Sequence, residues 1–365
     1  MGNAYITGGF SGEINFGNTT LSSNGLNDVL IAKIDANGDF LWAKSAGGSS
    51  GGDFGLDITV DGQGNSYVTG RFVGMASFGT FTLTSNGITD VFIAKLDSNG
   101  EFLWAKGAGG TGPDIGNGIA VDSQGNSYIV GYFGFSISFG DFDLISNGMW
   151  DVFVTKLDTY GNFLWAKSAG GNDFDEGYGI DLDIQGNPYI TGVICGTITI
   201  GNTSLSGLCD AFISKLNSNG EFLWTKRASG LSMVGYGLAI DNQGYSYVTG
   251  RFSGTASFDN ITLTAIGDND IFIAKLNKDT LSVIENSDVT LQIYPNPANN
   301  QISINSNSNS QIGQVEIYNL LGAKVDEVAV NNHEAVIDVS TLKAGTYFFK
   351  IYADSGVSTK KISKR

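Results

Sequence analysis

The chain has 365 residues, of which 41% are hydrophobic and 12% aromatic, and it contains 52 glycines but 4 prolines. A chain of this length and apolar content can bury a large core, and its glycines indicate frequent turns. The formal net charge of −16 argues against a nucleic-acid partner, because contacts with phosphates need clustered basic residues. No apolar run reaches the roughly 18 residues of a membrane-spanning helix, so we expect no transmembrane segment.

A block of about 60 residues recurs five times within residues 1–280. Its most regular line runs from an aspartate through apolar residues to a lysine, and the five aspartates are Asp28, Asp90, Asp151, Asp210 and Asp270. A period this constant means that one supersecondary unit has been copied, so the regular residues are expected to be structural. Function is expected where a residue departs from the repeat.

Each repeat predicts four short strands. In the third repeat they lie at residues 118–122 (strand A), 128–131 (strand B), 151–157 (strand C) and 163–167 (strand D). Asp-x-Gln-Gly and Asp-x-x-Gly turns separate A from B and C from D, since glycine supplies the positive φ of a tight hairpin. A variable insert separates B from C. The unit is therefore a four-stranded antiparallel meander.

Copies of such a meander can pack face to face around an axis. The predicted fold class is all-β: a β-propeller of about five four-stranded blades, one incomplete, followed by a second domain. A β-solenoid is the alternative, although its rungs are usually shorter. The count gives four A, five B, five C and four D strands, and residues 1–10 contain no secretory signal. We therefore expect a truncated N-terminus, or substitution of the missing strands by residues 281–290 and a neighbouring blade.

Three segments recur in a fixed order: Gly-Asn-Ser-Tyr-Val-Thr-Gly, Asp-Val-Phe-Ile-Ala-Lys-Leu-Asp and Asn-Gly-Glu-Phe-Leu-Trp-Ala-Lys. Through them, residues 1–280 resemble the bacterial β-propeller repeats of the SBBP kind. That resemblance implies an architecture more than an activity.

Residues 281–290 form a polar predicted linker before a second domain at 291–365. This domain resembles the type A C-terminal sorting domain of the type IX secretion system. Its landmarks are Tyr294, Pro295, Asn296, Pro297, Gly322, Leu342, Gly345, Tyr347, Lys360, Lys361 and Lys364. The resemblance implies a small immunoglobulin-like β-sandwich that an outer-membrane translocon reads and that is usually removed afterwards. It also implies a protein that is secreted or lies at the outer-membrane cell surface.

The residues of this second domain agree with a sandwich. The expected apolar strand positions are Val315 and Ile317, Val336 and Val339, and Tyr347, Phe349 and Ile351. An ordinary terminal sandwich that merely adds stability is the alternative.

The two cysteines, Cys195 and Cys209, bracket the B-to-C insert of one repeat, where aligned copies have Ser11 and Asn27. Two such substitutions around one insert suggest a disulfide in an oxidising compartment, and two separate thiols are the alternative. Two cysteines without a nearby histidine are too few for zinc. The Asp-containing turns offer one carboxylate each, which is too few for a calcium loop. No metal or cofactor is expected.

Catalytic constellations are scarce. The single histidine, His333, falls in the second domain, which excludes a Ser-His-Asp or Cys-His arrangement from the repeats. Paired carboxylates could support glycosidase chemistry, and the loops between blades offer Asp53, Asp114, Asp173, Asp175 and Glu176. Acidic loop residues are more often solvated than catalytic, so no catalytic residue is predicted.

Trp150 departs from the repeat. The equivalent residues are Asn27, Thr89, Cys209 and Asn269. An indole that the scaffold does not need can stack on a sugar or anchor a protein, although packing on a neighbouring loop is the simpler alternative. The predicted ligand-binding residues are Trp150, Asp175, Glu176 and Tyr178, with Phe174 and Tyr236 as weaker candidates.

These observations predict an exported propeller that binds an extracellular glycan or protein ligand and that the type IX translocon delivers. A secreted enzyme acting on polysaccharides through loop carboxylates is the alternative, because a propeller fold does not decide between binding and catalysis. A structural part of an adhesin is a third interpretation.

Overall fold

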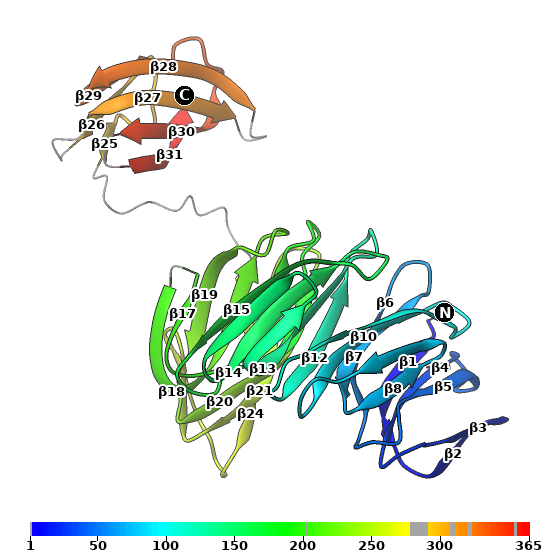
Figure 1. Ribbon diagram of the computed structural model, residues 1–365. Coiled ribbons are helices and arrows are strands. Elements are labelled where there is room, and N and C mark those ends of the chain that lie inside the picture. The colour runs from blue at the N-terminus through cyan, green and yellow to red at the C-terminus, as the bar shows by residue number, and fades with distance from the viewer. Residues whose placement is uncertain (1, 202, 278–290, 307–310, 320–322, 354–355) are drawn as a thin grey trace. The chain divides into compact units, whose positions relative to one another are not determined.

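The computed structural model describes residues 2–201, 203–277, 291–306, 311–319, 323–353 and 356–365. The chain divides into two compact units, Met1–Lys278 and Asp279–Arg365. Both consist of strands and turns, and the described residues contain no helix (Figure 1). The predicted linker at 281–290 lies outside the described residues.

The first unit repeats the predicted meander, with three blades of four strands and two of three among the described residues, which agrees with the all-β propeller assignment. Strand A is β6 (Phe54–Val60), β12 (Asp114–Val121), β16 (Glu176–Leu182) and β20 (Ser232–Ile240). Strand B is β1 (Ala4–Phe10), β7 (Ser66–Phe72), β13 (Ser127–Phe139), β17 (Pro188–Ile200) and β21 (Ser246–Ser253). Strand C is β4 (Asp28–Ile34), β10 (Asp90–Leu96), β14 (Phe142–Leu157), β18 (Thr203–Leu216) and β24 (Asp270–Leu276). Strand D is β5 (Phe40–Ala46), β11 (Phe102–Ala108), β15 (Phe163–Gly171) and β19 (Phe222–Ala228).

The described strands are distributed as the sequence count predicts. The three middle blades have four strands each, whereas the first blade (β1, β4, β5) and the last (β20, β21, β24) have three among the described residues. The variable insert between strands B and C is itself a hairpin. It forms β2 (Glu13–Phe16) with β3 (Thr19–Ser22), β8 (Met75–Phe78) with β9 (Phe81–Thr84) and β22 (Thr255–Phe258) with β23 (Ile261–Thr264). In the third and fourth blades the hairpin continues strands B and C directly, so these strands are longer than predicted.

Adjacent blades pack through their apolar faces. Val91 and Ile93 of the second blade lie in one cluster with Ile129 and Phe153 of the third blade. The same pattern joins the third blade to the fourth and the fourth to the last. Each fully buried Val, Ile or Phe contributes roughly 1.5–3 kcal/mol, so a blade depends on both neighbours.

A repeated polar contact fastens each blade to the next. The indole Nε1 of Trp104 in β11 donates to the carbonyl of Thr159, 3.1 Å away, in the C–D turn of the following blade. Gly161 in that turn has φ of +83°, and a Cβ on it would stand 3.0 Å from the indole, so glycine fits both demands. Trp42 and Trp165 make the same bond, also at 3.1 Å. These tryptophans belong to the scaffold. Of the three, Trp104 alone is buried, with 8% of its surface exposed, because strand D is outermost.

The second unit is a two-layered β-sandwich. One sheet has the order β25 (Leu291–Tyr294), β26 (Gln301–Ser306) and β29 (Glu334–Asp338). The other has the order β28 (Lys324–Asn332), β27 (Ile312–Asn319), β30 (Gly345–Ala353) and β31 (Gly356–Lys364). Ile304 and Ile337 from the first sheet pack against Val315, Ile317 and Phe349 from the second.

Val336, one of the expected apolar strand positions, lies on a strand but faces outward. Val336 is 63% exposed. Burial alternates along β29, so Ala335 and Ile337 point inward and the intervening Val336 points outward. Val339 is buried, but it follows the end of β29 and is therefore not the expected strand position.

Replacing Trp104 tests the contact between blades. Trp104→Phe keeps an aromatic six-membered ring but removes the N–H donor of the indole. We therefore expect the free energy of unfolding to fall by about 1 kcal/mol. Trp104→Ala also leaves a cavity and should cost roughly 3–5 kcal/mol. Denaturant unfolding measures both effects. Leu103→Ala, on the exposed face of the same strand, is the matched control, and an equal loss in that variant would contradict the assigned role.

Candidate functional site

Residues that break the repeat gather at one end of strands A and B. The residue type varies at the position after the strand-B glycine. In chain order the residues there are Gly9, Arg71, Tyr132, Val193 and Arg251. Its ladder partners on strand A also vary, and they are Phe54, Ile115, Glu176 and Val234. Because these positions lie opposite each other in each blade, this end of the blades is chemically variable while the rest is regular.

Trp150 lies at this end and packs against two aromatic neighbours. Its ring stacks on Tyr132, with centroids 5.0 Å apart and an interplanar angle of 23°. Phe174 meets the same indole edge-on at 4.8 Å, and the backbones of Trp150 and Phe174 form a parallel bridge. The indole is half-buried. The structure therefore brings the predicted Trp150 against Tyr132, which sequence reasoning missed.

Glu176 and Tyr178 lie one blade further on. The hydroxyl of Tyr178 donates to the carboxylate of Glu176, and its ring meets Tyr236 edge-on at 5.1 Å. The guanidinium of Arg251 stands 6.0 Å from the centroid of Tyr236. Burial, and after it the negative charge of Glu176, raise the pKa of Tyr132 to about 12.

We call Tyr132, Trp150, Phe174, Tyr178 and Tyr236 the aromatic cluster, which consists of two contacting groups: Tyr132 with Trp150 and Phe174, and Tyr178 with Tyr236. It spans the third, fourth and last blades, and it keeps exposed aromatic surface because Phe174 is 38% and Tyr236 44% exposed. The signal that could have identified Tyr132 and Arg251 was the variable position after the strand-B glycine, since neighbouring blades hold Arg71 and Val193 there.

Asp175, predicted as a ligand-binding residue, belongs instead to the junction between blades. It is fully buried, and its two carboxylate oxygens accept the backbone N–H groups of Gly171 (2.7 Å) and Cys195 (2.8 Å). Burial raises the pKa of Asp175 to about 6. Asp53 and Asp114 are buried in the same way, with pKa values raised to about 6 and about 7. These three acids therefore face the interior, whereas Asp173 is exposed.

Cys195 and Cys209 face each other across β17 and β18. Their Sγ atoms are bonded at 2.05 Å, and their Cα atoms lie 4.1 Å apart. The disulfide closes the base of the insert hairpin beside the variable end. The N–H of Cys195, which donates to Asp175, lies on one of the two strands that the disulfide joins.

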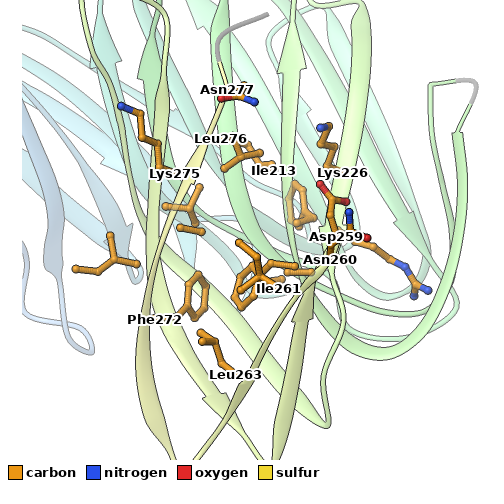
Figure 2. A pocket seen from close by; sticks show the side chains of 18 residues that line it. Ile213, Lys226, Asp259, Asn260, Ile261, Leu263, Phe272, Lys275, Leu276 and Asn277 are labelled. Atoms are coloured by element: carbon orange, nitrogen blue, oxygen red, sulfur yellow. The ribbon is translucent and has the colours of Figure 1, made fainter.

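A groove of about 470 Å³ lies between the fourth and last blades (Figure 2). Apolar side chains line it, among them Ile213, Ile261, Leu263 and Phe272. In the other blades a strand D pairs with strand C at this place, whereas β24 pairs only with β21 among the described residues. The groove therefore marks the place of a fourth strand. We assign it no ligand.

In the second unit the Tyr-Pro-Asn-Pro segment holds the last strand. The side-chain amide of Asn296 donates to the carbonyl of Lys361 at 3.0 Å, and its Oδ1 accepts the N–H of Ser363 at 2.9 Å. The N–H of Ala298 also donates to the carbonyl of Ser363 at 2.7 Å. The side chain of Asn296 thus bonds to the backbone of β31 as a neighbouring strand would. We call this contact the Asn296 clamp.

The other predicted landmarks are dispersed in the sandwich. The Tyr347 hydroxyl donates to the carbonyl of Lys343 at 2.9 Å, which closes the turn before β30. Lys360, Lys361 and Lys364 lie on β31. Gly322 lies outside the described residues.

Among the described residues, no three or more His, Cys, Asp or Glu side chains converge as a metal-ligand group. Within the same part of the chain, no helix has the length and apolarity to cross a membrane.

Comparisons with known proteins match the two units separately. The model of the secretion system C-terminal sorting domain matches residues 292–365. The SBBP β-propeller repeat model matches residues 41–71 and 103–132, which run from strand D of one blade to strand B of the next. Both agree with the resemblances found in the sequence.

Curated relatives match the repeats at low identity. An uncharacterized WD repeat-containing protein, L264, of Acanthamoeba polyphaga mimivirus is 27% identical over 263 residues, covering 58% of this chain and 19% of that protein. Regulatory protein FlaEY of Caulobacter vibrioides is 27% identical over 176 residues, covering 46% of this chain and 18% of that protein. The chain thus spans less than a fifth of either relative.

Solved structures resemble the chain only weakly. PorZ, described as an essential surface component of the type-IX secretion system of Porphyromonas gingivalis, is 11% identical with a TM-score of 0.31, and the match covers 93% of this chain and 50% of PorZ. The extracellular domain of BT4673 from B. thetaiotaomicron is 11% identical with a TM-score of 0.21, covering 99% of this chain and 57% of that one. TM-scores this low do not establish a shared fold.

The identity of the two units therefore rests on the blades, the sandwich and the two family models. The chain carries SBBP-type β-propeller repeats and ends in a C-terminal sorting domain of the type IX secretion system.

Proposed function

We propose that the propeller unit binds an extracellular glycan through the aromatic cluster and performs no chemistry on it. The sorting domain makes this a type IX-secreted surface protein. The observation that carries the proposal is the position of the cluster. Its five rings sit at the variable end of three blades, where the repeat does not require them, and two of them keep exposed ring surface.

The chemistry of the cluster suits a sugar. Aromatic rings offer a rigid apolar surface at low conformational-entropy cost, and Glu176 and Arg251 at the same place can accept or donate hydrogen bonds. Binding sites commonly combine apolar side chains with a few polar groups that fix orientation. A protein ligand would use the same surface, and the binding experiment separates the two.

Burial of the loop acids supports binding over hydrolysis. Asp53, Asp114 and Asp175 have no exposed surface, and each accepts backbone hydrogen bonds. A pair of carboxylates that flanks a glycosidic bond must reach the substrate. Asp173 and Glu176 are the acids left for the alternative polysaccharide-acting enzyme.

A glycan array probed with the full chain tests the binding role. Tyr236→Ala and Phe174→Ala should each weaken binding to any positive glycan by about tenfold or more, because central aromatic contacts dominate most binding surfaces. Tyr160→Ala is the matched control, since Tyr160 is 76% exposed but lies in a C–D turn.

Equal weakening by the control variant, or no effect of the cluster variants, would exclude the aromatic cluster. A protein ligand captured through the cluster, with no glycan bound, would replace the glycan. Hydrolysis of a polysaccharide that is lost in Glu176→Gln would favour the enzyme.

The Asn296 clamp is proposed to keep the sorting domain in the form that the translocon reads. Asn296→Ala removes two hydrogen bonds to β31, so amide hydrogen exchange at residues 360–365 should accelerate at least about tenfold. Less protein should reach the cell surface, and deletion of residues 291–365 should abolish delivery. Gln314→Ala is the matched control, since the Gln314 side chain bonds only to exposed Glu327 in the described hydrogen bonds. Unchanged exchange in Asn296→Ala would refute the clamp, and normal delivery after the deletion would refute the sorting role.

A further inference from the structure

Three of the four junctions between blades bury a pair of aspartates. The pairs are Asp28 with Asp53, Asp90 with Asp114, and Asp151 with Asp175, and each residue is at most 2% exposed. Within the described residues, none of the six forms an ion pair with Lys or Arg. Buried carboxylates without a compensating positive charge are strongly unfavourable, so each pair needs either a bound cation or a proton.

The first pair shows where that partner would lie. Asp53 accepts the N–H groups of Gly48 and Val73, both at 2.9 Å, and Oδ2 of Asp28 accepts the N–H of Asn24 at 3.1 Å. The other oxygen of Asp28, Oδ1, is buried and has no hydrogen-bond partner. These donors leave that oxygen free to serve a different ligand.

The two carboxylates of this pair converge beside Gly47. A Cβ on Gly47 would stand 2.8 Å from Oδ1 of Asp28 and 2.8 Å from Oδ2 of Asp53. A glycine with φ of +156° therefore occupies the one position where a side chain would collide with both carboxylates. The free oxygen of Asp28 and Oδ2 of Asp53 thus both lie close to one common point beside Gly47.

The second pair also has buried oxygens without a partner. Oδ1 of Asp90 and Oδ1 of Asp114 are both buried without a hydrogen-bond partner. The carboxyl group of Asp90 packs against Gly109, the counterpart of Gly47. In the third pair, the hydroxyl of Ser146 donates to Oδ1 of Asp151 at 3.1 Å, so the need for a further ligand is smaller.

The fourth junction lacks the second aspartate and holds a cation instead. Met233 stands where Asp53, Asp114 and Asp175 stand in the other repeats. An arginine, Arg227, binds Asp210 with its Nη1 at 2.7 Å from Oδ2. The other repeats have Ser45, Gly107 and Ser168 at the position of Arg227. The chain therefore places a fixed positive charge at the one junction of the four that has a single carboxylate.

We propose that the pairs Asp28–Asp53 and Asp90–Asp114 each bind a Ca²⁺ ion between adjacent blades. Ca²⁺ prefers carboxylate, carbonyl and water oxygens, and extracellular modules bind it with dissociation constants of about 10⁻⁴–10⁻³ M. Each pair supplies two carboxylates, which fits weak sites of this kind. The ions take the role that Arg227 has at the fourth junction and join the first three blades. This inference is independent of the aromatic cluster.

Calorimetric titration of the full chain with CaCl₂ after EDTA treatment tests the proposal. We expect about two sites per chain and a rise of several degrees in Tm in millimolar Ca²⁺. The double variant Gly107→Arg with Asp114→Met copies the fourth junction into the second. A Cβ on Gly107 meets its nearest neighbour at 3.4 Å, which is ordinary contact. This variant should lose one site. Glu101→Gln, a change at an exposed carboxylate, should keep both.

Three results would overturn the proposal. The first is the absence of Ca²⁺ binding in the unaltered chain, which stays decisive even if the double variant does not fold. The second is retention of both sites in a folded double variant, which would place the ions elsewhere. The third is a Tm in EDTA that falls as pH rises from about 4 to 7 and does not respond to Ca²⁺. Carboxyl groups that hold a proton in the folded state are stabilising at low pH, so that result would mean that each pair shares a proton.

Discussion

Every blade of the propeller has two apolar faces, and neither can be buried by the blade alone. The effect is visible at equivalent positions of strand C. Val91 and Ile93 are fully buried against the third blade, whereas Ile271 and Ile273 in the last blade are 83% and 74% exposed. The residue type is nearly the same, so the presence of a following blade decides the burial. At about 25 cal/mol per Å² of apolar surface, stacking is the largest stabilising contribution available to this unit.

Stacking also explains the polar groups at the junctions. A face-to-face interface excludes water, so any polar group within it needs a partner from the next blade. The tryptophan N–H finds one in the following C–D turn, and Trp224 Nε1, next to the last described blade, has none among the described residues. The buried aspartates likewise need a partner for their negative charge. At the fourth junction, Arg227 supplies that positive charge to Asp210.

Most of the scaffold could be predicted from the sequence because it repeats. The period located strands A to D, and motif order identified the sorting domain. Strand ends were less predictable, because the insert hairpins extend β13, β14, β17 and β18. Val336 lies on a strand as expected, but the apolar pattern did not reveal that it stands on the exposed face. The aspartate pairs were invisible, since their members lie far apart in sequence, and burial moved Asp175 from a predicted ligand surface to the interior. Tyr132 was missed because its position looked like ordinary repeat variation.

The regular residues thus stabilise the stacking of blades, the terminal sandwich matches a sorting domain, and the variable end is where we propose ligand binding. Native-state hydrogen exchange along strand B measures the dependence of a blade on its neighbours, because β7, β13, β17 and β21 are each hydrogen-bonded on both sides and differ mainly in whether a further blade covers them. We predict that amides in β21 exchange orders of magnitude faster than those in β7 and β13. Equal protection in β21 would show that single blades are stable without a neighbour, and it would contradict the account.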